Sequence, residues 1–192
     1  MSKITVVGIV KDGTEIGIKN LLAVLVNYIL FILTCWIPYL NIGTFIGLIT
    51  MPAKMSKGET LSFTEIFNPV YRKYMGEGFL AIGLMSSGIT LGFVFFIIPG
   101  IVISIAWSLT LLLVFDKKMD PISAIKKSND VTYGNKLMIV LGKLIYFILI
   151  GIVMSILALI PGIGGLLGFI FLLVAFSLLM GVDAYIYREL AN

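Results

Sequence analysis

Two ionisable residues lie inside long apolar segments, and they are the first candidates for chemistry. Lys143 interrupts the apolar run 137–160, and Asp183 interrupts the run 166–186. An ionisable group inside a membrane is costly unless it finds a partner, so such residues are functional candidates. Both lie at a similar, shallow depth, which favours a Lys143–Asp183 ion pair. Two alternatives stay open: Lys143 extends to the headgroups while Asp183 reaches water, or both belong to a proton or ion pathway.

A third polar residue, Asn27, lies at comparable depth in the apolar run 21–39. Asparagine in a membrane segment commonly forms a hydrogen bond between helices. Asn27 is therefore predicted either to join a polar cluster with the lysine and aspartate or to make such a bond.

Two carboxylates, Asp116 and Asp120, bracket Lys117 and Lys118 at the end of a further apolar run. Two carboxylates near a membrane surface can bind a cation or carry out acid–base chemistry. Four charges within five residues are more typical of a solvated loop, which is the interpretation that we favour.

The sequence lacks the residues and motifs of most metal, catalytic and nucleotide-binding sites. The chain contains no histidine and a single cysteine, Cys35, so zinc sites and catalysis by an imidazole base are excluded. No Walker loop, dinucleotide fingerprint or nucleic-acid motif occurs. We therefore expect no metal, no cofactor and no nucleic-acid partner. A lipid-modifying enzyme built from carboxylates alone is the remaining enzymatic alternative.

The composition indicates an integral membrane protein. Hydrophobic residues make up 59% of the chain and charged residues 12%, and the mean hydropathy is +1.10. A soluble domain of 192 residues could not hide so much apolar surface. Charged residues are scattered through the first 20 positions, and no short apolar core with a cleavage site follows. The N-terminus is therefore expected to remain in the mature protein.

Six apolar segments are candidates for all-α transmembrane structure. They are 21–39, 42–52, 79–98, 101–115, 137–160 and 166–186. An upright transmembrane helix needs about 20 residues. The second segment is shorter, so we expect it to lie where the bilayer is thinned, to run into the interface, or to continue as helix beyond Pro52.

Three turns with an Ile-Pro pair divide these segments into hairpins. Their prolines are spaced by 61 and 62 residues. The turn residues are Pro38, Pro99, Gly100, Pro161 and Gly162. Equal spacing favours a single membrane domain made of three copies of one unit, about 1–57, 58–118 and 119–192. The copies would be related by an axis along the membrane normal. A chance similarity of three hairpins is the alternative.

A more polar segment precedes each hairpin: 4–18, 62–74 and 121–133. The second has aromatic residues at helical spacing, so it is predicted to be an amphipathic helix on the membrane surface or on the ends of the spans. In the first segment, Gly8, Gly13 and Gly17 are expected to weaken any helix.

Positive charge lies on one side of the predicted bundle. All 14 Lys and Arg residues fall in the N-terminal arm (the first 20 residues), in 54–73, in 117–143 or at Arg188. The turns contain none. Positive residues collect on the cytoplasmic side, so both termini are predicted to be cytoplasmic. Six of these residues are candidates for contact with anionic lipid. They are Arg72, Lys73, Lys117, Lys118, Lys126 and Lys127.

The region 98–135 shows a resemblance to a known family. The residues that carry it are Ile98-Pro99-Gly100-Ile101, Trp107, Asp116, Asp120-Pro121-Ile122, Ala124, Ser128, Thr132 and Gly134-Asn135. Their order resembles the membrane domain attached to some glycerophosphoryl diester phosphodiesterases, and allied multi-span proteins of bacteria and archaea. The resemblance implies a six-span bundle in a prokaryotic cell membrane. The phosphodiesterase activity of the fused proteins belongs to a separate soluble barrel that has no counterpart in these residues, so we do not transfer it.

Two functions from different classes fit these features. The first is a non-enzymatic membrane protein that organises lipid or partner proteins through its cytoplasmic face. The second is a channel or transporter for a small solute, ion or lipid, which would have a polar entry near Asn27, Lys143 and Asp183. The outer half has few polar residues, so a pore would need a homo-oligomer. Expected partners are membrane lipids and either further copies or another membrane protein.

Overall fold

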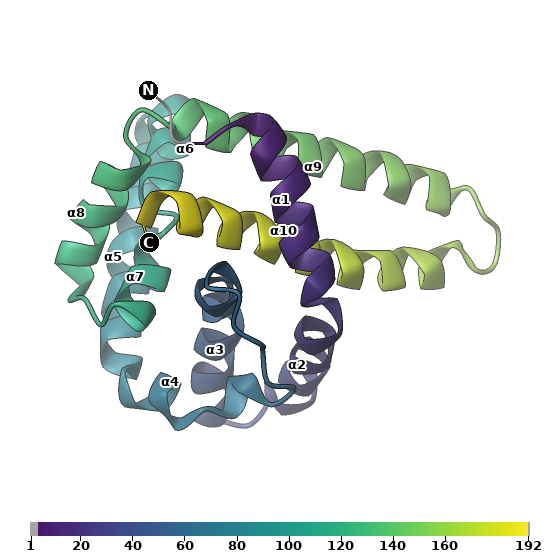
Figure 1. Cartoon of the computed structure of the whole chain (residues 1–192), viewed down its shortest axis with the longest axis horizontal. Coiled ribbons are helices and arrows are strands. Elements are labelled where there is room, and N and C mark those ends of the chain that lie inside the picture. The colour runs from purple at the N-terminus through teal and green to yellow at the C-terminus, as the bar shows by residue number, and fades with distance from the viewer. Residues whose placement is uncertain (1–3, 192) are drawn as a thin grey trace.

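The computed structural model describes residues 4–191, and the regular structure of this part is entirely helical (Figure 1). The helices, in chain order, are α1 (Val6–Lys19), α2 (Leu21–Thr34), α3 (Leu40–Ser56), the short 3₁₀ helix η1 (Glu65–Phe67), α4 (Pro69–Lys73), α5 (Met75–Phe95), α6 (Ile97–Ala106), α7 (Thr110–Asp116), α8 (Pro121–Thr132), α9 (Lys136–Ala158) and α10 (Gly164–Ala191).

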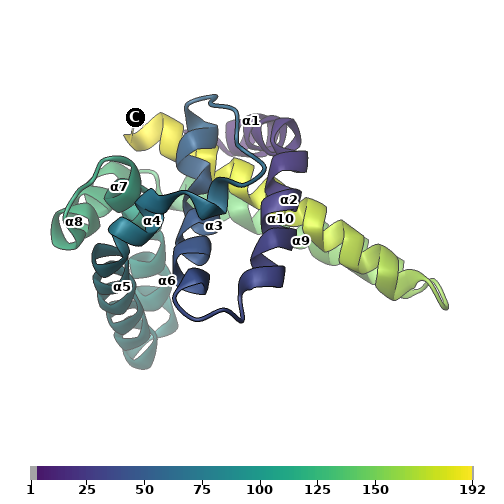
Figure 2. The same ribbon diagram turned by 90° about the horizontal axis from the view of Figure 1, so that it is seen from below.

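Three helical hairpins make up most of the molecule. They are α2 with α3, α5 with α6 and α7, and α9 with α10, and in each the two arms pack against each other. The turn ends of the hairpins diverge, and the α9–α10 hairpin projects furthest to one side (Figure 2). The helices α1, α4 and α8 precede the hairpins in the chain.

Four helical segments are long and apolar enough to cross a membrane. They are Met75–Phe95, Ile97–Asp116 (α6 and α7 together), Lys136–Ala158 and Gly164–Ala191. A fifth would be α1 with α2, a pair bent by 68°. Large apolar side chains lie exposed along these helices, which is favourable in lipid. These are the features of a membrane protein.

The structure differs from the six predicted spans in the first hairpin. α2 has only 14 residues, and α3 has 17 and continues through Pro52 to Ser56. Most of α3 is buried by protein, because α2, η1, α7 and α10 all pack around it. α3 is therefore the central helix of the fold, and packing within the chain compensates for its shortness.

The middle turn also differs from the prediction. The chain bends at Phe96, which is extended, and α6 begins at Ile97. Pro99 and Gly100 consequently lie in the first turn of α6 rather than in the connection. Proline fits there because the first amides of a helix have no acceptor within it. Pro38 lies in the α2–α3 connection, and Pro161 and Gly162 lie in the α9–α10 connection.

The N-terminal segment is a regular helix, contrary to the expectation that its glycines weaken it. α1 crosses α10 at close range: a Cβ at Gly17 would lie 2.8 Å from Leu178 Cα, and one at Gly13 would lie 3.0 Å from Val182 Cα. Ser177 Oγ donates a hydrogen bond to the Gly17 carbonyl at 2.9 Å. The glycines cost intrinsic helix propensity, but the tight packing that they permit offsets it.

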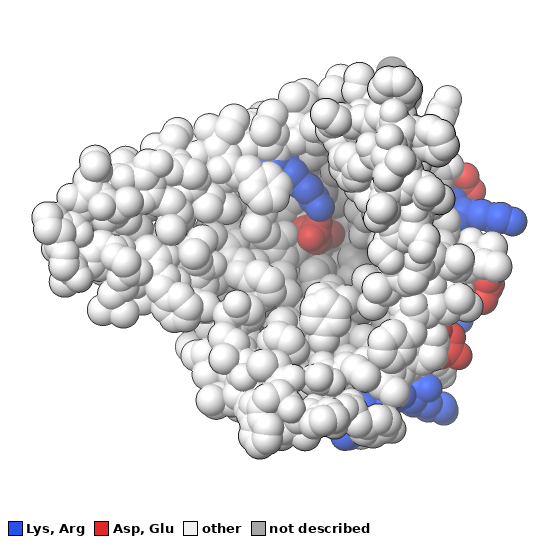
Figure 3. Space-filling model, turned by 180° about the vertical axis from the view of Figure 1, so that it is seen from behind, with Lys and Arg blue, Asp and Glu red and all other residues white. Residues whose placement is uncertain are grey.

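The buried core is shared between hairpins. One apolar cluster joins α1, α7, α9 and α10 around Ile9, Leu113, Ile139 and Tyr187. A second joins α2, α3 and α10. Seen from behind, the molecule shows a face that is almost uncharged and hollowed near its centre, with most of the visible charge along one edge (Figure 3).

Candidate functional site

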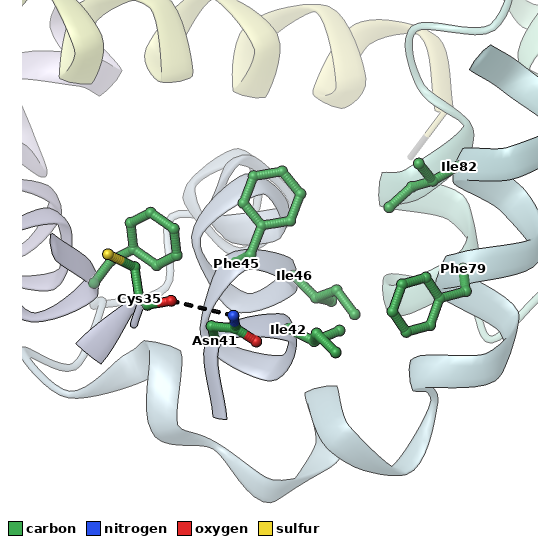
Figure 4. A pocket seen from close by; sticks show the side chains of 8 residues that line it. Cys35, Asn41, Ile42, Phe45, Ile46, Phe79 and Ile82 are labelled. Atoms are coloured by element: carbon green, nitrogen blue, oxygen red, sulfur yellow. Dashed lines mark hydrogen bonds between the residues drawn. The ribbon is translucent and has the colours of Figure 1, made fainter. Parts of the chain in front are cut away.

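An apolar cavity of about 350 Å³ lies between the first two hairpins (Figure 4). It is lined by Phe31, Cys35, Asn41, Ile42, Phe45, Ile46, Phe79 and Ile82. These residues come from α2, the α2–α3 connection, α3 and α5. No ionisable side chain other than the Cys35 thiol is among them, so the cavity suits a hydrocarbon chain and not a polar solute.

Helical spacing explains how the lining converges. Ile42, Phe45 and Ile46 share one face of α3, and Phe79 and Ile82 share one face of α5, as expected at spacings of three and four. Asn41 Nδ2 donates to the Cys35 carbonyl at 3.1 Å and closes the end of the cavity near the turn (Figure 4).

The predicted ion pair is present between α9 and α10. Lys143 Nζ lies 2.6 Å from Asp183 Oδ1, and 29% and 39% of the two side chains are exposed. Neither side chain forms another hydrogen bond or ion pair with residues 4–191. A contact between a basic and an acidic side chain is visible in the hollow of the uncharged face (Figure 3). The pair therefore retains two N–H donors and a carboxylate oxygen for other groups.

Asn27 has a separate role and does not join this pair. It is fully buried. Its Nδ2 donates to the carbonyls of Ala23 and Ser62, both at 2.8 Å, and its Oδ1 accepts the Ile66 N–H at 3.0 Å. Asn27 thus anchors the segment that follows α3, and the predicted polar cluster of three residues is wrong.

The sequence pattern did not single out one buried carboxylate, Glu65. Glu65 Oε1 binds Lys54 Nζ at 2.7 Å and accepts the Tyr71 hydroxyl at 2.8 Å. Burial and this bond to a carboxylate raise the pKa of Tyr71, which keeps the phenol neutral. Lys54 lies in the last turn of α3, but nothing in the sequence pairs it with Glu65.

Asp116 is the centre of the second network, and the interpretation as a solvated loop is wrong for it. Its side chain is 10% exposed, forms an ion pair with Lys57, and accepts the Tyr187 hydroxyl at 2.8 Å. Asp120 instead caps α8 at the surface, where hydrogen bonding by the Ser123 side chain and backbone lowers the pKa of its carboxyl. The two carboxylates thus have separate structural roles.

The six predicted lipid-contact residues are spread over three places. Arg72 is half-buried on α4, and Lys73 lies 5.7 Å over the Tyr74 ring. Lys117 binds the carbonyl of Ala191. The remaining three, Lys118, Lys126 and Lys127, are exposed at or near α8.

Comparison with known protein families, with curated proteins and with solved structures gave no match. No family is therefore assigned. Several residues that carry the resemblance noted above have structural contacts: Ser128 Oγ donates to the Ala106 carbonyl at 2.7 Å and accepts the Leu109 N–H at 3.2 Å. They hold α8 against the break between α6 and α7.

The site combines three properties. An apolar cavity is formed by separate hairpins, and an ion pair lies between two long apolar helices. Cations that form no ion pair with residues 4–191 lie on α4 and α8. Within residues 4–191, no group of three or more metal-ligating side chains occurs. The arrangement is suited to holding an amphiphile.

Proposed function

We propose that this protein is a non-enzymatic membrane protein that binds lipid between its hairpins and organises it beneath a basic surface. The observation that carries the proposal is the apolar cavity between α2–α3 and α5. An apolar cavity between helices in a bilayer is filled by chains of the surrounding lipid, because the lining otherwise loses its dispersion contacts.

The orientation belongs to the same proposal. The basic residues of the arm, of α4 and of α8 would lie on the cytoplasmic side of a prokaryotic cell membrane, and the uncharged turns would lie at the opposite ends of the hairpins. Two further full spans, making six, would require α2 and α3 each to cross where the bilayer is thin.

The packing of the surface helices supports a threefold repeat. α1 of the first unit packs on α10 of the third. η1 and α4 of the second unit pack on α3 of the first, and α8 of the third packs on α6 and α7 of the second. Each returning arm is thus covered by a surface helix from another unit, in cyclic order. This order is expected for three related units around one axis.

Lipid retention tests the proposed function. Ile82→Trp would fill the cavity, and the protein purified in mild detergent is expected to retain less lipid by native mass spectrometry. Leu80→Trp is the matched control, because Leu80 lies on the same helix, is 53% exposed and does not line the cavity. Failure of the unmodified protein to retain any lipid would contradict the function.

A second candidate function, passage of a small solute or ion, is favoured by the Lys143–Asp183 pair. Proton or ion flux in proteoliposomes that disappears in Asp183→Asn would support it. The apolar surroundings of the pair provide no polar path across the remaining depth of the membrane, so we place this function second.

A further inference from the structure

The side chain of Arg72 packs on α3, the helix that forms one wall of the apolar cavity. Its aliphatic part covers Gly43 on α3: a Cβ at Gly43 would lie 2.5 Å from Arg72 Cγ and 3.3 Å from Cδ. Gly43 adjoins Ile42, a lining residue of the cavity. The glycine therefore makes room for an arginine on the helix that forms one wall of the cavity.

The guanidinium of Arg72 is without a polar partner in the described part of the chain. It forms no hydrogen bond or ion pair with any of residues 4–191, although the side chain is half-buried. Lys73, its neighbour, has only the contact with the Tyr74 ring in that part of the chain. Unlike Lys54 and Lys57, which are bound to buried carboxylates, these two cations retain their full donor capacity.

Along the chain from α4 into α5, the order of charge and apolar lining matches that of a phospholipid. α5 begins at Met75, directly after α4, and the lining residues Phe79 and Ile82 follow in its first two turns. At a rise of 1.5 Å per residue they lie about 6 to 10 Å further along the apolar helix. The short helix that carries this cation therefore leads directly into an apolar helix that lines the cavity.

We infer that Arg72 and the apolar cavity form one site for a single anionic glycerophospholipid from the leaflet on which α4 lies. The phosphate accepts hydrogen bonds from the guanidinium, whose planar fork suits bidentate contact with phosphate oxygens. Lys73 adds a second positive charge, and one acyl chain occupies the cavity between α3 and α5. The inference rests on the proposed function and specifies which lipid the protein holds and where.

Nanodiscs that contain phosphatidylcholine with a minor fraction of phosphatidylglycerol test the site. Native mass spectrometry should show one tightly held phosphatidylglycerol per chain. Arg72→Gln should weaken its retention about tenfold, which corresponds to about 1.4 kcal/mol. Lys11→Gln, which removes an exposed cation of α1 that is not a candidate for lipid contact, should change retention less than about twofold. Arg72→Lys should fall between, because it keeps the charge but loses the fork.

The single cysteine gives a second measurement. Cys35 lines the cavity, so a membrane-permeant maleimide should react with it several-fold more slowly in phosphatidylglycerol than in phosphatidylcholine. Arg72→Gln should abolish this difference. Inorganic phosphate at millimolar concentration should give no protection, because it lacks the chain that fills the cavity.

Three results would overturn the inference and leave the proposed function intact. They are equal losses in Arg72→Gln and Lys11→Gln, which would show diffuse surface attraction; equal retention of both lipids; and full protection of Cys35 by free phosphate. Thermal unfolding of each variant in detergent shows that it is folded, and if Arg72→Gln does not fold, Arg72→Lys and the Cys35 comparison in the unmodified protein decide. Absence of any retained lipid in the unmodified protein would instead contradict the function itself.

Discussion

At the residue scale, Lys143 and Asp183 are a pair whose members depend on each other. Two charges 2.6 Å apart between apolar helices are weakly screened. Removal of one leaves the other charge without its partner. Lys143→Met and Asp183→Asn should each lower the free energy of unfolding. The double variant should lose less than the sum, with a coupling of about 1 kcal/mol. Unfolding in detergent mixtures measures the cycle. An effect of Asp183→Asn with none from Lys143→Met would show that the pair is not a stabilising unit.

Asn27 is a residue at which a small change should be costly. Asn27→Leu keeps the approximate volume but leaves the buried Ile66 N–H without its partner and removes one of the two hydrogen bonds that the Ser62 carbonyl accepts. An unsatisfied buried group costs about 1 to 3 kcal/mol. Thermal unfolding should show the loss, and limited proteolysis should show faster cleavage near residues 58–64. Asn20→Leu is the control, since the Asn20 amide bonds only to Ile16 of the preceding helix. Equal effects of the two substitutions would count against the anchoring role.

The sequence could identify the residues with unusual environments, but not always their partners. Ionisable groups inside apolar runs are rare, so Lys143 and Asp183 were recognisable and their similar depth predicted the pair. The Glu65 carboxylate lies in a polar stretch, where a solvated side chain is expected. Its burial depends on contacts with Lys54 and Tyr71, which the local sequence does not indicate. The apolar cavity had no signal at all, since its lining residues are indistinguishable in sequence from those that face lipid.

At the element scale, the α1–α10 crossing is set by glycines. A Cβ on Gly181 would collide with backbone atoms of Gly13 and Gly17, which cannot move aside as a side chain can. Gly181→Ala should therefore displace α1, with a loss of about 1 to 3 kcal/mol, and should expose α1 to protease. Gly151→Ala is the matched control, because a Cβ there meets nothing within 4 Å. Unchanged protection of α1 in Gly181→Ala would contradict the packing.

Helix positions were predictable from the apolar runs, and the roles of two helices were not. α1 contains glycines that weaken a helix in isolation, and the partner that makes them useful, α10, is more than 150 residues away in sequence. α3 is too short for the bilayer, and only its burial by the elements that surround it explains it. In both cases tertiary packing overrides a local rule.

At the scale of the whole molecule, the three hairpins are tied together at one end and diverge at the other. The carboxylate networks of Glu65 and Asp116 connect α3 to η1, α4, α7 and α10. No comparable polar contact connects the hairpin turns within residues 4–191. The diverging ends leave the hollow of Figure 3, and a bilayer would fill it with lipid chains. Far ends that diverge from a connected basic end support the proposal that the protein orders lipid.

The depth of the first hairpin gives the last prediction. A Cβ at Gly47 would touch Ile66 and the Tyr71 ring, so η1 and α4 lie beside the middle of α3. Only about seven residues of α3 extend beyond that level, or about 10 Å, whereas α5 extends for 21 residues, or about 30 Å, the thickness of the hydrocarbon core. The turn that contains Cys35 should thus end in the leaflet on which α4 lies.

In oriented vesicles, an impermeant maleimide applied at the side opposite α8 should not label Cys35, whereas a permeant maleimide should. In Cys35→Ser protein, Phe96→Cys should be labelled from that opposite side and Lys126→Cys only from the side of α8. Labelling of Cys35 from the side that reaches Phe96→Cys would show that α2 and α3 cross the membrane after all.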